Sequence, residues 1–212
     1  MEFPILYSFR RCPYAMRARM ALKYSEITYI HREIKLSNRP DKLYEISPKG
    51  TVPVMMISDN KIIEESLDIM HYAIQIKDSK NLYQNHLEKQ DNLIKKNDYQ
   101  FKKALDRYKY HVRFKEKTYE FYQEEVATFL KEYDIILRNQ KYLINENITL
   151  SDYAIFPFIR QCAHVDLIWF KKNFKYLALW LEKLKTSELF ISIMKKYDIW
   201  TEGAKDTIVK ND

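Results

Sequence analysis

The chain has 212 residues, of which 46% are hydrophobic, so it can bury a sizeable core as one large domain or two small ones. This composition argues against global disorder. Only two glycines occur, Gly50 and Gly203, which excludes a phosphate-binding glycine loop and a dinucleotide-binding fingerprint. So few glycines also favour a mostly helical protein with few tight β-turns.

The cysteine content and the hydropathy pattern indicate a reducing, intracellular compartment. Cys12 and Cys162 could form at most one bond, so the sequence carries no disulfide scaffold. Arg10 and Arg11 interrupt the N-terminal apolar residues, which argues against a secretory signal. No apolar run reaches the roughly 18 residues that span a bilayer. We therefore expect a soluble cytoplasmic protein with no membrane partner.

The net charge of +7 is concentrated in residues 95–117, called here the basic segment, where nine Lys and Arg residues face three acidic ones. Tyrosines are interleaved with these cations, a pattern that can bind nucleic acid. A solvated helix face near an anionic small-molecule site is the alternative, and we favour it over a nucleic-acid partner.

The first third of the chain alternates strand and helix patterns. The expected elements are, in order, strand 5–9, helix 14–24, strand 28–34, a short helix or turn at 39–45, strand 52–57, strand 61–63 and helix 65–76. Asp59 and Asn60 supply the turn between the last two strands. This order predicts a small mixed sheet with helices packed on it, in a domain covering residues 1–77.

The remainder is long and helix-periodic, which predicts a linker at 78–85 and an all-helical domain at 86–212. The expected helices are 87–114, 119–138, 153–163, 175–184 and 188–196. Thr149 and Asp152 can cap the helix that follows them, and Pro157 should kink that helix or mark a local departure from it. The tail after Trp200 is expected to be weakly ordered.

Cys12 stands where a strand should pass into a helix, with Pro13 suited to the first helical position. The free amides and the positive dipole end of that helix favour a thiolate, as do Arg10, Arg11 and Arg17 nearby. The alternative is a small buried apolar cysteine, which this local electrostatic environment disfavours.

Four motifs in order resemble the cytosolic glutathione transferase superfamily, in particular its cysteine-type members such as the omega class and related bacterial proteins. They are Cys12-Pro13-Tyr14-Ala15, Thr51-Val52-Pro53-Val54, Glu64-Glu65-Ser66-Leu67 and the capped segment from Thr149 to Gln161. The resemblance covers nearly the whole chain. It implies an α/β thioredoxin-like N-terminal domain followed by an all-α helical-bundle C-terminal domain, and glutathione as co-substrate without a metal.

The resemblance also implies which residues bind glutathione. Val52, before a cis Pro53, would pair with its cysteinyl backbone. Ser66 would receive the γ-glutamyl carboxylate and Glu65 the γ-glutamyl ammonium. The remaining expected contacts are Tyr14 in the active-site turn, and Arg39 or Lys49 at the glycyl carboxylate.

Cys12 replaces the serine or tyrosine hydroxyl of the conjugating classes, and Ala15 replaces a resolving cysteine. We therefore predict a monothiol cycle, in which Cys12 forms a mixed disulfide with glutathione and reduces a disulfide or another oxidised small molecule. Conjugation to hydrophobic electrophiles, with the hydroxyl of Ser8 or Tyr7, is the enzymatic alternative. A regulatory protein on this scaffold, like those that bind RNA polymerase, is the alternative from another class.

Three further expectations concern residues outside the motifs. Cys162 should be a core residue. The acceptor pocket should include some of Tyr14, Tyr108, His111, Arg160 and Trp169, although packing or surface roles are favoured for these. The resemblance implies a homodimer in which the two long helices at 87–114 and 119–138 take part.

Overall fold

The structure is a computed structural model that describes residues 2–211, and it divides into two compact units. The first unit contains the described residues up to Lys80 together with those from Ser187 onward, and the second contains Asn81–Thr186. We expected residues 86–212 to form one helical domain, but the final segment packs with the first unit instead.

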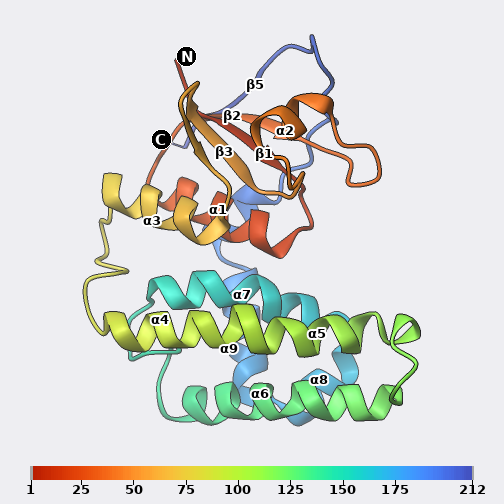
Figure 1. Cartoon of the computed structure of the whole chain (residues 1–212). Helices are drawn as coiled ribbons and strands as arrows, with labels where there is room; N and C mark the ends of the chain where they lie inside the picture. The colour runs from red at the N-terminus through yellow and green to blue at the C-terminus, as the bar shows by residue number, and fades with distance from the viewer. Residues whose placement is uncertain (1, 212) are drawn as a thin grey trace. The chain divides into compact units, whose positions relative to one another are not determined.

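The first unit is built on a five-stranded mixed sheet of strand order β4-β3-β1-β2-β5 (Figure 1). Its elements are β1 (Ile5–Ser8), α1 (Pro13–Tyr24), β2 (Tyr29–Glu33), α2 (Asp41–Ile46), β3 (Val54–Ser58), β4 (Lys61–Ile63), α3 (Ser66–Ile76), α10 (Glu188–Ile193) and β5 (Thr207–Val209). Strand β1 runs parallel to β2 and antiparallel to β3, and α1 packs beside α3. The predicted order of strands and helices up to residue 76 is confirmed.

Successive side chains of β1 point to opposite faces of the sheet, and all of them are buried. Ile5 and Tyr7 cluster with Leu43 of α2 and with Val54 of β3, and Cys12 packs against the edge of this cluster. Leu6, between them, is also fully buried. The site thus rests on a packed layer formed by the first strands of the chain.

The expectation of a weakly ordered tail is wrong, because the tail adds strand β5 to the sheet. β5 pairs antiparallel with β2, in a register that places Ile208 opposite Ile30. Before it, the Trp200 N–H donates to the Glu33 carbonyl over 2.7 Å, and the Trp200 ring lies edge-on to Tyr7. Backbone pairing along an open sheet edge therefore orders a segment that lacks a strong strand pattern.

The second unit is helical, as expected. Its helices are α4 (Leu87–Lys95), the π-helical turn η1 (Lys96–Phe101), α5 (Lys102–Lys109), the 3-10 turn η2 (His111–Arg113), α6 (Tyr119–Asn139), α7 (Leu150–Ala163), α8 (Leu167–Asn173) and α9 (Lys175–Lys185). The predicted helix 87–114 is therefore a succession of α-, π- and 3-10 turns. We did not predict α8.

The Asp152 carboxylate organises the start of α7. It accepts hydrogen bonds from the Thr149 N–H and hydroxyl, and also from Leu143 N–H and Trp180 Nε1, at 2.8 to 3.0 Å. Burial raises the pKa of this carboxyl, against the effect of these donors. The α-helix continues through Pro157 to Ala163 without a break, because dense packing outweighs the local cost of the proline, and the expected kink stays a prediction.

Candidate active site around Cys12

Cys12 is the N-cap residue of α1, and Pro13 is the first residue of that helix. The backbone of Cys12 is extended, with φ −73° and ψ 124°, and its carbonyl accepts the first helical hydrogen bond, from Met16 N–H at 2.8 Å. The thiol is half-buried. It therefore lies at the end of α1 where the helix dipole stabilises negative charge.

The strand entry opposite Cys12 adopts the predicted geometry. The Val52-Pro53 peptide bond is cis, which confirms that prediction. The Cys12 thiol donates to the Val52 carbonyl, with 3.6 Å between Sγ and the oxygen. The thiol and the main chain of Val52 therefore face the same cavity, as recognition of a peptide backbone beside a nucleophile requires.

The start of α3 forms another wall of the cavity. Glu65 is the N-cap residue of α3, in an extended conformation, and Ser66 is its first helical residue. Arg17, on α1, donates from Nε to the Ser66 hydroxyl over 2.9 Å, and both side chains are buried. Helix amides, a hydroxyl and a guanidinium thus lie together, a combination that suits a carboxylate.

Two cations stand along the rest of the rim. Lys49 Nζ lies 3.2 Å from Glu65 Oε1, and both side chains are exposed. The hydrogen bond that Lys49 donates to Glu65, followed by the charges of Glu64 and Glu65, raises the pKa of the Lys49 amine. The Nε atom of Arg39 is buried without a hydrogen-bond partner among the described residues. Arg39 is therefore available to an anionic ligand.

These side chains share one cavity of about 390 Å³. Its lining includes every site residue that the sequence predicted, namely Cys12, Tyr14, Arg39, Lys49, Val52, Pro53, Glu65 and Ser66. Leu36, Thr51 and Glu64 complete it. A volume of this size falls in the range of small-ligand sites and suits a tripeptide-sized ligand.

Sequence reasoning missed the role of Arg17, which we had assigned only as a positive charge near Cys12. Its bond to Ser66 joins residues 49 positions apart, so no local pattern signals it. The Arg17 guanidinium also lies over the Tyr14 ring, 5.2 Å from its centroid. Arg17 thus links α1, α3 and one wall of the cavity.

The hydroxyl groups of Tyr7 and Ser8 do not reach this cavity. Both side chains are fully buried, and neither lines it. The Tyr7 hydroxyl accepts a hydrogen bond from Arg32, and the Ser8 hydroxyl accepts one from Arg19 at 2.5 Å. Burial also raises the pKa of the Tyr7 phenol. The expected alternative in which one of these hydroxyls activates glutathione is therefore disfavoured by the structure.

The predicted acceptor residues of the second unit are largely packing residues. Tyr108 is fully buried, stacks near Trp169 at a centroid distance of 5.8 Å, and shares a hydrogen bond with Tyr119. His111 packs edge-on against Tyr119. Cys162 is a buried residue of α7, as expected, and burial raises the pKa of its thiol.

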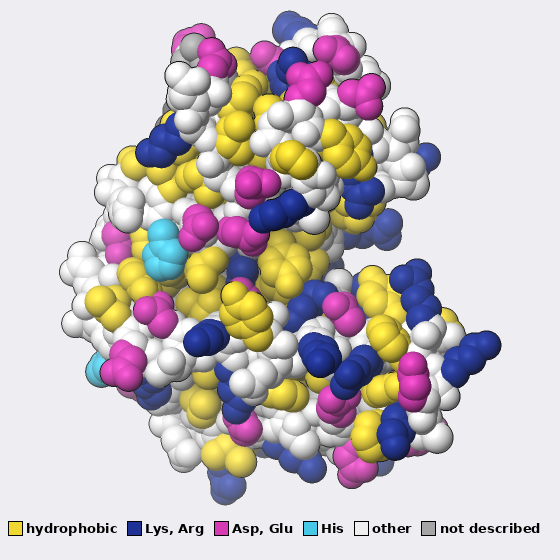
Figure 2. Space-filling view, viewed as in Figure 1, with side chains coloured by type: hydrophobic (Ala, Val, Ile, Leu, Met, Phe, Trp, Pro, Cys, Tyr) yellow, Lys and Arg dark blue, Asp and Glu magenta, His cyan; other side chains and the backbone are white. Residues whose placement is uncertain are grey.

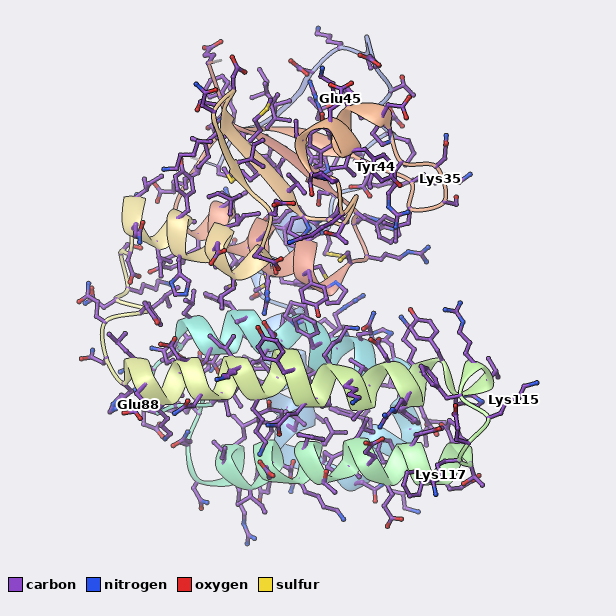
Figure 3. All side chains as sticks on the ribbon, in the orientation of Figure 1. Lys35, Tyr44, Glu45, Glu88, Lys115 and Lys117 are labelled. Carbon is purple, nitrogen blue, oxygen red and sulfur yellow. The ribbon has the colours of Figure 1, made fainter. Side chains whose placement is uncertain are left out.

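The basic segment forms an exposed face of the second unit. Figure 2 shows dark-blue side chains gathered where α5 and the loop after it lie, and Figure 3 places Lys115 and Lys117 on that loop. Three of its cations pair with acids: Lys96 with Glu132, Lys102 with Asp106 and Arg107 with Glu125. This pairing is typical of a solvated helix face.

Neither a metal-binding cluster nor a membrane-spanning helix is found in residues 2–211. Within this range, no three His, Cys, Asp or Glu side chains gather in a group that could hold a metal ion. Also within it, no helix combines the length and apolar character needed to cross a bilayer.

Sequence comparisons place these features among known proteins. The family models for the N-terminal and C-terminal domains of glutathione S-transferase match residues 6–81 and 99–189. Pyrimidodiazepine synthase of Drosophila melanogaster is 25% identical, over 93% of this chain and 83% of its own length. Glutathione S-transferase omega-1 of Rattus norvegicus is 24% identical, over 85% of this chain and 76% of its own length.

Solved structures share the fold. A glutathione transferase from Phanerochaete chrysosporium in complex with oxidized glutathione superposes with a TM-score of 0.78 and 16% identity, covering 90% of this chain and 94% of its own. Glutathione S-transferase-I bound with lactoylglutathione has a TM-score of 0.74 and 17% identity, covering 90% and 98%. At this identity the likeness concerns the fold alone.

Proposed function

The chain belongs to the glutathione S-transferase superfamily, and from that premise we propose that it is a glutathione-dependent thiol transferase or reductase acting through a Cys12 mixed disulfide. The observation that carries this proposal is the position of Cys12. Its half-buried thiol lies at the N-terminus of α1, in the cavity that contains the Val52 carbonyl, while the nearby Tyr7 and Ser8 hydroxyls are buried elsewhere.

The proposed binding mode follows from the groups along the cavity. The Val52 main chain would pair with the cysteinyl backbone of glutathione, and Ser66 with the α3 amides would bind the γ-glutamyl carboxylate. Glu65 would bind the γ-glutamyl ammonium, once its exposed ion pair with Lys49 opens at little cost. Arg39, with its unpaired buried Nε, is the stronger candidate for the glycyl carboxylate.

The proposed reaction has two thiol–disulfide exchanges. The Cys12 thiolate attacks the glutathionyl sulfur of a mixed disulfide, so that a bond to Cys12 forms as the original S–S bond breaks. The other thiolate leaves and takes up a proton. A second glutathione thiolate then attacks the Cys12 mixed disulfide, which yields oxidised glutathione and regenerates Cys12. Because Ala15 cannot resolve the intermediate, this second glutathione is required.

The proposal is tested by mass spectrometry after incubation with oxidised glutathione, together with a thiol-transfer assay on hydroxyethyl disulfide. We expect one glutathionyl adduct, on Cys12, and loss of both adduct and activity in Cys12→Ala. The variant should still bind glutathione, because the binding groups are unchanged. Cys162→Ala is the matched control and should behave as wild type. Full transferase activity in Cys12→Ala would contradict the proposal, and conjugation activity alone in that variant would favour the alternative chemistry.

We also propose that the protein is a homodimer. Large apolar side chains are exposed on the helices of the second unit, including Tyr99 at 73% and Ile135 at 63%. Covering such side chains is a common reason for self-association. Sedimentation at micromolar concentration tests this directly, and a single species at the chain mass of 25.8 kDa would contradict the dimer.

A further inference from the structure

A second cavity, of about 260 Å³, lies in the first unit and has no role in the proposed reaction. Its lining comes from the second half of α1, the start of β2, the end of α10 with the segment after it, and β5 with the residues after it. The residues that matter here are Arg19, Lys23, Tyr29, Lys195, Tyr197 and Lys210. We call it the C-terminal cavity, because the chain from residue 192 to 211 supplies much of its lining.

Arg19 is a buried cation in the wall of this cavity, with 1% of its surface exposed. Its guanidinium donates only to neutral oxygens of the described residues: the Ser8 hydroxyl and the carbonyls of Phe9, Arg10 and Ile193. Glu33 acts on it electrostatically, but no carboxylate of residues 2–211 forms an ion pair with it. A buried charge without a paired counter-ion is costly, so an anion entering this cavity would gain from Arg19.

Three lysines add to this positive charge. Lys23, Lys195 and Lys210 all line the C-terminal cavity, and none of them forms an ion pair with another described residue. The described lining contains no acidic side chain. Four positively charged side chains therefore line one small cavity, which favours an anionic ligand.

Two tyrosines, Tyr29 and Tyr197, also line the cavity, beside aliphatic and small polar residues of α10 and β5. Tyr29 is 2% exposed, and Tyr197 stacks on the buried His31 ring at a centroid distance of 4.4 Å. Burial raises the pKa of both phenols, so both are neutral and do not offset the cationic charge. Tyrosine and aliphatic side chains beside cations suit a ligand that carries a ring as well as a charge.

We propose that the C-terminal cavity binds a small aromatic oxyanion, an aryl phosphate or an aryl carboxylate, at a site separate from the Cys12 cavity. The oxyanion lies toward Arg19 and the lysines, and the ring lies against Tyr29 and Tyr197. The two oxyanion types share this chemistry, and titration with phenyl phosphate and with benzoate separates them.

Isothermal titration calorimetry on the full chain tests the proposal, with phenyl phosphate and benzoate as probes. The double variant Lys23→Ala/Lys210→Ala should bind the preferred probe about fivefold more weakly or worse, since it removes two charge contacts. Lys195→Ala should weaken binding as well. The matched control is Lys196→Ala, because Lys196 is the exposed neighbour of Lys195 and does not line the cavity. It should bind like wild type. Arg19 is left unchanged, because it also holds the loop before Cys12.

Three outcomes would overturn the proposal. The first is no measurable binding of either probe at millimolar concentration. The second is equal affinity in wild type and the Lys23/Lys210 variant. The third is loss of binding in Lys49→Ala with retention in the Lys23/Lys210 variant, which would place the anion in the Cys12 cavity. None of these outcomes depends on whether Cys12 performs thiol transfer, so the proposed function is tested separately.

Discussion

Arg17 donates from Nε to the hydroxyl of Ser66 over 2.9 Å, and this buried contact joins the helix that begins after Cys12 to the first residue of α3. The proposed γ-glutamyl site therefore rests on an internal bond between two helices. Ser66 holds α1 against α3, and in the proposed binding mode it also receives the γ-glutamyl carboxylate. The side chain of its neighbour Glu65 is exposed and pairs with the exposed Lys49, so the proposed binding mode gives Glu65 a ligand role without a buried structural contact.

This difference predicts distinct effects for the two alanine variants. Ser66→Ala should lower both glutathione affinity and the free energy of unfolding, because a hydrogen bond to a charged group contributes about 1.5–3 kcal/mol. Glu65→Ala should lower affinity by about tenfold to a hundredfold while leaving stability near wild type. Calorimetry with glutathione and urea unfolding measure the two effects. Unchanged affinity in both variants would move the γ-glutamyl site elsewhere.

The two cysteines should differ sharply in reactivity. Cys12 is half-buried in a cavity, whereas Cys162 is 1% exposed within α7 and burial raises the pKa of its thiol. We expect iodoacetamide to modify Cys12 alone in the folded protein, and both thiols in guanidinium chloride. Peptide mapping of the alkylated chain reports this. Modification of Cys162 at a comparable rate under native conditions would show that α7 opens, contrary to its dense packing.

Local motifs predicted the backbone geometry around Cys12, because each part of it depends on residues adjacent in sequence. Pro13 at the first turn of α1, the cis bond before Pro53 and the start of α3 at Ser66 are all of this kind. The contact of Arg17 with Ser66 and the pairing of β5 with β2 were not predicted. Both join distant parts of the chain, where tertiary packing decides the partner and local propensity carries no signal.

His31 should make stability depend on pH. It is 2% exposed on β2, and its Nε2 lies 3.0 Å from Glu33 Oε2. Burial lowers the pKa of the imidazole, although its hydrogen bond to the Glu33 carboxylate acts in the opposite direction. The unfolded chain therefore takes up this proton more readily than the folded one. The free energy of unfolding should fall as the pH drops below about 6.5, the ordinary pKa of histidine.

Urea unfolding at several pH values between about 5.5 and 7.5 measures this dependence. His31→Gln keeps a polar side chain of similar size and removes the titration, so its stability should change less with pH. A smaller slope will remain, because burial also lowers the pKa of His164. Identical slopes in the variant and the wild type would refute the role of His31.

Gly50 should be required for the loop that carries Lys49 and Val52. Its φ is +59°, and a Cβ added there would lie 2.3 Å from the ring of Tyr44, which Figure 3 shows on α2. Gly203 is a matched control, since its φ is +80° but an added Cβ would meet nothing within 4 Å. The two glycines therefore share the backbone requirement, and only Gly50 has a steric one as well.

Alanine at the two positions separates these requirements. Gly203→Ala should cost only the backbone penalty of about 1–2 kcal/mol. Gly50→Ala should cost more, and should also weaken glutathione binding by displacing Lys49. Replacing Tyr44 by alanine in the Gly50→Ala background should recover the steric part and leave the backbone part. Thermal unfolding of wild type and these three variants compares the costs, and equal losses in Gly50→Ala and Gly203→Ala would show that the Tyr44 ring simply moves aside.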